Sequence, residues 1–147
     1  MLLEQAGPDQ LLDAIAKYKI TIPFTAPTAY RAMLGKLKQF DVSSLRKCVS
    51  AGEALPSPIF NEWKQKTGLE IVDGVGSTEF GYIYLCNTPG QIRLDSSGKV
   101  FPGHRFRLVN SDGNDAGPDD LGELWMSSPA TASYYWRNHE RSKIGRA

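Results

Sequence analysis

The sequence is poor in the residues that build disulfide frameworks, zinc sites and strongly charged surfaces. Its 147 residues include two cysteines, Cys48 and Cys86, which lie too far apart in the sequence to form a metal-binding pair. We expect neither zinc nor a disulfide, and we interpret both cysteines as small buried apolar residues. The formal net charge is +1, so the composition does not favour binding to nucleic acid or to an anionic membrane surface.

Long apolar runs are also missing from the sequence. No stretch approaches the roughly 20 apolar residues that a bilayer-spanning helix needs. Glu4 and Asp9 come early and no basic stretch precedes them, which argues against a signal peptide. We therefore predict a cytoplasmic protein with no membrane and no nucleic acid partner. An apolar content of 41% and a charged content of 22% are typical of a globular domain with a hydrophobic core.

Residues 1–90 alternate between strand patterns and helix patterns. Helical apolar spacing or helix-boundary residues predict three helices, at 9–19, 28–37 and 57–68. The third is the best marked, with Ser57 as N-cap, Pro58 in the first turn and Gly68 at its end. Short apolar runs predict buried strands at 20–25, 45–50 and 69–72. This alternation predicts an α/β fold with a parallel sheet, flanking helices and right-handed crossovers.

The later part of the sequence favours β structure. Residues 104–109 alternate between apolar and charged side chains, which is typical of a half-buried antiparallel strand. Residues 111–114 predict a hairpin turn and residues 122–126 a later strand. We therefore divide the chain into an α/β subdomain, residues 1–90, and a small β-rich subdomain, residues 91–147, which we expect to be incomplete.

Two glycines, two hydroxyls and two carboxylates gather in the segment Asp-Gly-Val-Gly-Ser-Thr-Glu at 73–79. Gly74 and Gly76 lack a Cβ, so their backbone N–H groups can approach an anion closely. Thr78 offers a hydroxyl donor, and Glu79 offers the kind of oxygen ligand that Mg²⁺ selects beside nucleotide phosphates. Taken alone, such a segment is more often an ordinary strand-to-helix turn.

Two further motifs lie upstream, each at the carboxyl end of a predicted strand. Residues 24–30 are Phe-Thr-Ala-Pro-Thr-Ala-Tyr, and residues 50–56 are Ser-Ala-Gly-Glu-Ala-Leu-Pro. In open parallel sheets, ligands collect outside the carboxyl ends of the strands, because the loops there carry helix N-termini and free N–H groups. We therefore interpret the three motifs as one ligand-binding site.

In this order and spacing the three motifs resemble the adenylate-forming (ANL) superfamily of acyl-CoA synthetases, luciferases and peptide-synthetase adenylation domains. Its acidic core motif is roughly Tyr-Gly-x-Thr-Glu, which residues 75–79 match in part. Within the superfamily the chain is most similar to benzoate-CoA and 2-aminobenzoate-CoA ligases. The resemblance is collinear to about Ser142, and residues 144–147 do not continue it. It implies ATP or AMP, Mg²⁺ and coenzyme A as cofactors or co-substrates, with an aromatic carboxylic acid as substrate.

The resemblance also implies a role for each motif residue. Thr78 matches the family's phosphate-contacting threonine and Glu79 its magnesium-associated glutamate, so these two are the expected catalytic residues and Glu79 the expected metal ligand. The expected nucleotide-binding residues are Gly52, Glu53, Ala54, Asp73, Gly74, Val75, Gly76, Ser77 and Thr78. The expected acyl pocket is lined by Ala51, Gly52, Gly76, Tyr82 and Ile83. Its small members leave room for a flat ring, against which Ile83 would pack.

Some positions depart from the family pattern. Val75 stands where many members place an aromatic residue that stacks on the base. The benzoate-type enzymes share an aliphatic residue at this position with the present chain. An aliphatic side chain still covers a ring, with less stacking energy. Tyr82 stands where the benzoate-type enzymes tend to carry histidine, and Gly81 replaces a bulkier apolar residue. The identity of the acid therefore stays open, as does the oligomeric state.

Several family elements do not occur in this chain: the Ser/Thr/Gly-rich phosphate loop, the ribose-binding Thr-Gly-Asp and the carboxyl-terminal domain with its lysine. We therefore expect a piece of an acyl-CoA ligase that is inactive alone. Two alternatives stay open. One is a non-catalytic truncated remnant that binds nucleotide or a partner protein, and the other is an adenylation domain that loads an aryl acid onto a carrier protein.

Other conspicuous side chains have simpler interpretations. We expect Tyr30 to pack in the core and the segment 134–136, Tyr-Tyr-Trp, to form an aromatic packing patch, because no basic cluster surrounds it. His104 and His139 have no partner that suggests a catalytic dyad, so both are predicted to be surface residues.

Overall fold

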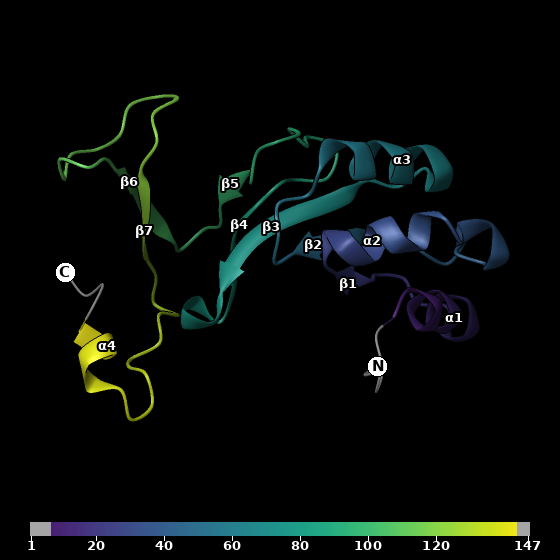
Figure 1. Cartoon of the computed structure of the whole chain (residues 1–147), viewed down its shortest axis with the longest axis horizontal. Coiled ribbons are helices and arrows are strands. Elements are labelled where there is room, and N and C mark those ends of the chain that lie inside the picture. The colour runs from purple at the N-terminus through teal and green to yellow at the C-terminus, as the bar shows by residue number, and fades with distance from the viewer. Residues whose placement is uncertain (1–6, 144–147) are drawn as a thin grey trace. The chain divides into compact units, whose positions relative to one another are not determined.

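A computed structural model describes residues 7–143 and shows an α/β fold (Figure 1). Five strands form one sheet in the order β1-β2-β3-β4-β5, and β6 and β7 form a two-stranded sheet. By its contacts the chain divides into two compact units: the first runs to Val75 and adds Leu85–Lys99, and the second comprises Gly76–Tyr84 and the residues from Val100 onward. The division at residue 90 that the sequence suggested stays a prediction.

The strands of the described residues are β1 (Phe24–Thr25), β2 (Cys48–Ala51), β3 (Ile71–Ser77), β4 (Tyr82–Cys86), β5 (Lys99–Val100), β6 (Arg105–Val109) and β7 (Glu123–Ser127). The α-helices are α1 (Pro8–Tyr18), α2 (Pro27–Leu34), α3 (Ser57–Thr67) and α4 (His139–Lys143). Short 3-10 helices lie at Leu37–Gln39 and Thr78–Phe80.

The first unit contains the predicted strand-helix-strand crossovers. β1 pairs with β2, and β2 pairs with β3, in both cases parallel. Helix α2 connects β1 to β2, helix α3 connects β2 to β3, and both α1 and α3 pack against α2 (Figure 1). The expectation of an α/β fold with a parallel sheet is therefore confirmed.

The core of the first unit is centred on two aromatic side chains. Tyr30 from α2 and Trp63 from α3 are both 0% exposed, and their rings meet edge to face with centroids 4.8 Å apart. The Tyr30 hydroxyl donates a hydrogen bond of 3.0 Å to the carbonyl oxygen of Val49 on β2. Burial raises the pKa of the Tyr30 phenol far above its usual value. Tyr30 is thus a core residue, as predicted.

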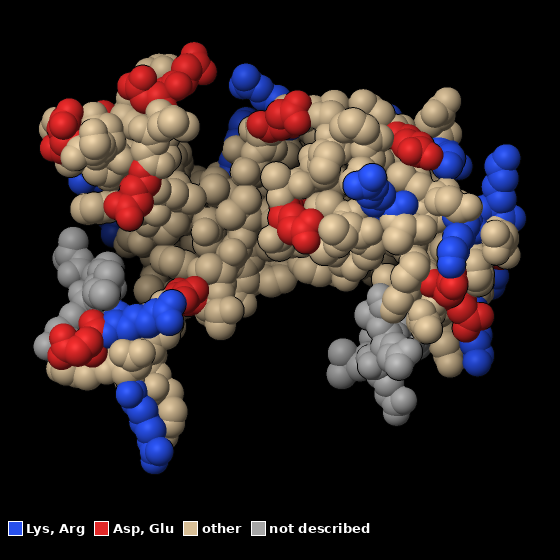
Figure 2. All heavy atoms as spheres, viewed as in Figure 1, with Lys and Arg blue, Asp and Glu red and all other residues tan. Residues whose placement is uncertain are grey.

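Some charged side chains on the outside of this unit form pairs of opposite sign. Lys36 forms an ion pair with Asp9 at 2.6 Å, and Lys66 pairs with Glu62, four residues earlier on α3, at 2.6 Å. On the face drawn in Figure 2, acidic and basic groups lie interspersed over the helices. The expected lack of a nucleic acid partner stays a prediction.

Several boundaries in the first unit differ from the sequence-based expectation. β1 and β2 begin later, at Phe24 and Cys48, and α2 ends at Leu34 instead of residue 37. β3 continues to Ser77 instead of ending at residue 72: its ladder with β2 extends as far as the pair Ala51–Gly74, and β4 pairs with it on its other side. Helix α3 begins at Ser57 itself, after Pro56 as N-cap. The Ser57 hydroxyl does not cap the helix, since it donates to the Asp95 carboxylate at 2.8 Å.

The second unit contains the predicted antiparallel β structure. β6 and β7 pair in the register Phe106–Met126 and Arg107–Trp125. The predicted turn at 111–114 is closed by the Asn110 side chain, whose Oδ1 accepts hydrogen bonds of 3.0 Å from the N–H groups of residues 112 and 114. It leads back to Asp115, which bridges to Val109, so it does not connect β6 directly to β7.

Some surface predictions for the chain were wrong. The Tyr134, Tyr135 and Trp136 side chains do not form a packing patch, because they are 67%, 36% and 78% exposed. His139 is exposed as expected, whereas His104 is half-buried. Within residues 7–143, no helix combines the length and the apolar character needed to cross a membrane. Residues 144–147 lie outside the described residues.

Candidate functional site

In the first unit, β1 and β2 end at the level of residues 73–74 of β3, which itself continues to Ser77. Thr25 at the end of β1 pairs with Ser50 on β2, and Ser50 pairs in turn with Asp73 on β3. The next pair is Ala51 with Gly74. Residues of the three sequence motifs, which lie far apart in the chain, are therefore neighbours here.

A sharp turn follows β2 and leads into α3. Gly52 has a φ of +94°, in the left-handed region that favours glycine, so the chain can leave the strand directly after Ala51. Gly52, Glu53 and Ala54 are exposed in this turn, and Pro56 then begins the helix as its N-cap. The predicted nucleotide-binding turn is thus an accessible loop before a helix N-terminus.

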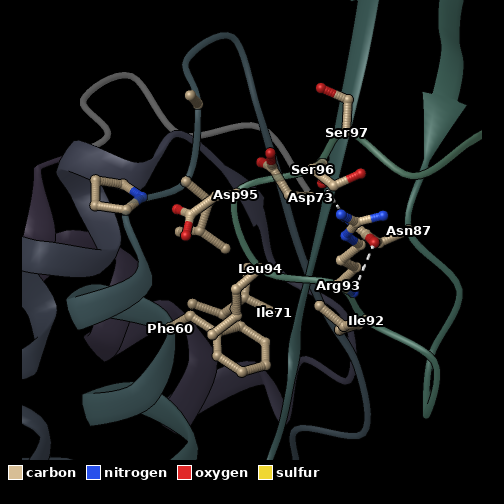
Figure 3. A pocket seen from close by; sticks show the side chains of 13 residues that line it. Phe60, Ile71, Asp73, Asn87, Ile92, Arg93, Leu94, Asp95, Ser96 and Ser97 are labelled. Carbon is tan, nitrogen blue, oxygen red and sulfur yellow. Dashed lines mark hydrogen bonds between the residues drawn. The ribbon is translucent and has the colours of Figure 1, made fainter. Parts of the chain in front are cut away.

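A cavity of about 290 Å³ opens beside this turn (Figure 3). It is lined by Ala54, Leu55, Pro56, Phe60, Ile71, Asp73, Asn87, Ile92, Arg93, Leu94, Asp95, Ser96 and Ser97. Apolar side chains, among them Phe60, Ile71 and Ile92, form much of the wall, and Asp73 and Asn87 contribute polar groups. Two predicted site residues, Ala54 and Asp73, therefore line the same cavity.

Asp73 is the most unusual polar group of this cavity. Asp73 is only 9% exposed, and its Oδ1 has no hydrogen-bond partner among residues 7–143. Burial raises the pKa of the Asp73 carboxyl above its ordinary value. A buried oxygen without a partner is costly for the fold, so this position suits a ligand group that can donate a hydrogen bond.

Asn87 lines the cavity beside Asp73 and was not identified from the sequence. Its Nδ2 donates to the Ser96 carbonyl oxygen at 2.6 Å, and its Oδ1 accepts the Arg93 N–H at 3.2 Å. Its backbone N–H donates to the Asp73 carbonyl oxygen at 3.0 Å. The Asn87 side chain thus holds the loop after β4 as a wall of the cavity. In the sequence, the only signal for this role is a lone asparagine after an apolar run.

Replacing Asp73 with asparagine is expected to stabilise the fold at neutral pH by on the order of 1 kcal/mol, because a buried charge is removed. The pKa of Asp73 is higher in the folded state than in the unfolded state. Protonated Asp73 therefore adds to the stability of the fold at low pH, and this contribution is lost as pH rises through the folded-state pKa. Urea denaturation should therefore show the advantage of the variant at pH 7 and no advantage near pH 3. An advantage of the same size at both pH values would contradict the assignment.

The second unit holds the remaining residues of the acidic motif. Gly76 lies so close to the next strand that a Cβ there would come within 2.8 Å of the Ile83 Cα and would overlap the Tyr82 carbonyl oxygen. Ile83 is buried and Tyr82 is 59% exposed, because successive strand residues point to opposite faces. The backbone of Gly76 therefore lies against the backbone of Tyr82 and Ile83. The role of these three residues in an acyl pocket stays a prediction.

Glu79 lies in the 3-10 turn that follows β3, next to the exposed Thr78. Its carboxylate oxygen Oε1 accepts a hydrogen bond of 2.6 Å from the Tyr135 hydroxyl. This hydrogen bond, foremost among several, holds the pKa of Glu79 below its ordinary value. Tyr135 was not predicted as a site residue, and a contact between residues 56 positions apart leaves no local signal in one sequence.

Residues 7–143 contain no group of three or more His, Cys, Asp or Glu side chains that could hold a metal ion. A single carboxylate such as Glu79 is still compatible with Mg²⁺, which usually keeps several waters and is bound through one or two carboxylates plus substrate phosphates. The donor set therefore fits a metal that arrives with a nucleotide.

Comparison with known proteins identifies one family and similar proteins within it. A protein-family model described as AMP-binding enzyme matches residues 2–136. The chain is 36% identical over 143 residues to the 4-hydroxybenzoate-CoA/benzoate-CoA ligase of Rhodopseudomonas palustris, covering 95% of this chain and 26% of that protein. It is 36% identical over 146 residues to the benzoate-CoA ligase of Thauera aromatica, covering 97% of this chain and 28% of the relative.

A solved structure has the same fold as this chain. The anthranilate CoA ligase AuaEII in complex with anthranoyl-AMP superposes with a TM-score of 0.92 at 40% identity, covering 97% of this chain and 28% of that one. The chain thus spans about a quarter of the length of the relatives that it matches.

Proposed function

Because the chain belongs to the AMP-binding enzyme family, we propose that it forms the adenylate-binding part of an ATP-dependent ligase that activates an aromatic carboxylic acid and passes the acyl group to coenzyme A. The similarity to ligases for benzoate and anthranilate supports this substrate class. A cytoplasmic location is part of the same proposal.

The observation that carries the proposal is the cavity beside the turn after β2, with the unpartnered oxygen of Asp73 in its wall. A purine offers an amino group that can donate to this oxygen, and its flat faces suit apolar walls such as those of Ile71 and Ile92. The exposed turn at Gly52–Ala54 lies beside the same cavity and supplies backbone groups for the rest of the base.

The proposed reaction has two steps. A carboxylate oxygen of the acid attacks the α-phosphorus of ATP and pyrophosphate leaves; the coenzyme A thiol then attacks the acyl carbon and AMP leaves. Thr78 donates its hydroxyl to a phosphate oxygen, and Glu79 supplies a carboxylate that would hold Mg²⁺. When bound, the metal would neutralise phosphate charge, and this chain's own residues contribute mainly alignment and electrostatic stabilisation.

A chimera tests this proposal in a complete enzyme. In it, the aligned quarter of the Rhodopseudomonas palustris ligase is replaced by this chain, and benzoate-dependent pyrophosphate release is measured. Thr78→Ala and Glu79→Gln are each expected to lower the rate by about 100-fold, because each removes a group that stabilises the phosphate charge. Glu62→Gln on the exposed side of α3 is the matched control and should keep the rate.

The outcomes separate clearly. The isolated 147-residue chain is expected to release no pyrophosphate, since it spans only about a quarter of its relatives. A folded chimera that forms no benzoyl-adenylate, or one in which Glu79→Gln changes the rate no more than Glu62→Gln, would refute the proposed roles.

A further inference from the structure

We propose that Tyr135 is a positioning residue for Glu79: its hydroxyl fixes one oxygen of the carboxylate and thereby directs the other oxygen toward the metal. The role of Glu79 as a metal ligand rests on the proposed function. The link between Tyr135 and Glu79 rests on the structure of the second unit alone.

The hydrogen bond between the two side chains has the geometry of a strong one. The Tyr135 Oη lies 2.6 Å from Glu79 Oε1, within the range of charge-assisted O–H···O⁻ bonds, which are roughly twice as strong as neutral ones. Glu79 is also fixed through its main chain, because the Ala132 N–H donates to the Glu79 carbonyl oxygen at 2.6 Å. The segment 132–135 therefore holds both the backbone and the side chain of Glu79.

Tyr135 is itself held in place by the residues that follow it. The Ser142 hydroxyl accepts a hydrogen bond of 2.9 Å from the Tyr135 N–H, and the Arg141 guanidinium lies over the Tyr135 ring, 5.0 Å from its centroid. Arg141 also attracts the Glu79 carboxylate electrostatically, as a smaller influence on its pKa than the Tyr135 hydroxyl. The donor thus comes from a ring with a defined orientation.

A purely structural role explains this arrangement poorly. The Tyr135 residue is 36% exposed, and its neighbours Tyr134 and Trp136 are more exposed still, so the three rings do not form a core. Carboxylates that bind metals are commonly oriented by a further hydrogen bond, whose loss costs about 10–100-fold in metal affinity or activity. The Tyr135 hydroxyl occupies that position relative to Glu79.

The NMR signal of the Glu79 carboxyl tests the link directly. The chain labelled with ¹³C at glutamate side chains is compared at neutral pH as wild type, Tyr135→Phe and the matched control Tyr134→Phe. Removal of the Tyr135 hydroxyl takes away the donor that lies 2.6 Å from Glu79 Oε1. We expect the Glu79 carboxyl resonance to shift in Tyr135→Phe and to stay unchanged in Tyr134→Phe.

Manganese bound to ATP provides the second readout, because Mn²⁺ accepts the same oxygen ligands as Mg²⁺ and broadens nearby resonances. The affinity of Mn²⁺–ATP at Glu79 is expected to fall about 10-fold in Tyr135→Phe and not in Tyr134→Phe. An unchanged Glu79 resonance and unchanged affinity in Tyr135→Phe, with Mn²⁺–ATP still bound at Glu79 in wild type, would overturn the positioning role alone. Failure of Mn²⁺–ATP to reach Glu79 in wild type would overturn the metal role, and with it that part of the proposed function.

Discussion

Replacing Trp63 with alanine is expected to lower the free energy of unfolding by about 3–5 kcal/mol. The Trp63 side chain is 0% exposed, and it joins α3 to α2 through its edge-to-face contact with Tyr30. Loss of the indole removes buried apolar area and leaves a space between two helices and the sheet that the backbone cannot close. Urea denaturation followed by circular dichroism measures the loss.

Trp125→Ala is the matched control for this substitution. Trp125 lies on β7 and is 45% exposed, so the same truncation removes less buried area and creates no closed cavity. We expect a loss of about 1 kcal/mol, typical of substitutions outside the core. Equal losses for the two tryptophans would show that the α2–α3 contact is not the centre of the core.

Gly98→Ala is expected to be at least as damaging, at about 4–5 kcal/mol, a size reached only by a few mechanisms. Two of them act together here. Gly98 has a φ of +85°, which strains any residue with a Cβ, and the added Cβ would overlap the Cys86 carbonyl group and the Asn87 nitrogen. Because the obstructing atoms belong to the backbone, no side-chain rotation relieves the overlap.

Gly90→Ala separates strain from overlap. Gly90 has a similar φ of +77°, yet nothing lies within 4 Å of the position that its Cβ would take. Only the left-handed strain remains, which costs about 1–2 kcal/mol. Thermal unfolding of both variants measures the difference, and similar melting temperatures would mean that the close approach of Gly98 to Cys86 is not maintained in solution.

The sequence was sufficient to predict the parallel α/β part, because its signals are local. Helical spacing gave α1, and Gly68, with a φ of +76°, ends α3 as the boundary residues indicated. The order of the three motifs along alternating strands and helices also predicted that they lie close together, and Ser50 and Asp73 from two of them are paired in the sheet. Each of these inferences needs only neighbouring residues and the general handedness of crossovers.

The features that were missed depend on contacts between distant residues. The hydroxyl of Ser57 had two possible uses, a helix cap or a bond to another segment, and only the position of Asp95 decides between them. The Tyr135 ring was expected to pack, because aromatic neighbours suggest burial; its exposure and its bond to Glu79 follow from tertiary structure. The wall formed by Asn87 likewise depends on how the loop at 91–97 folds back.

The burial of the Tyr30 phenol gives this protein a built-in optical reporter. A phenol whose pKa is raised in the folded state favours folding below the ordinary tyrosine pKa and opposes it as pH rises above that value. In alkaline solution Tyr30 can become phenolate only when the contact with Val49 opens, so its ultraviolet absorbance change follows the opening of the helical layer and not simple surface ionisation.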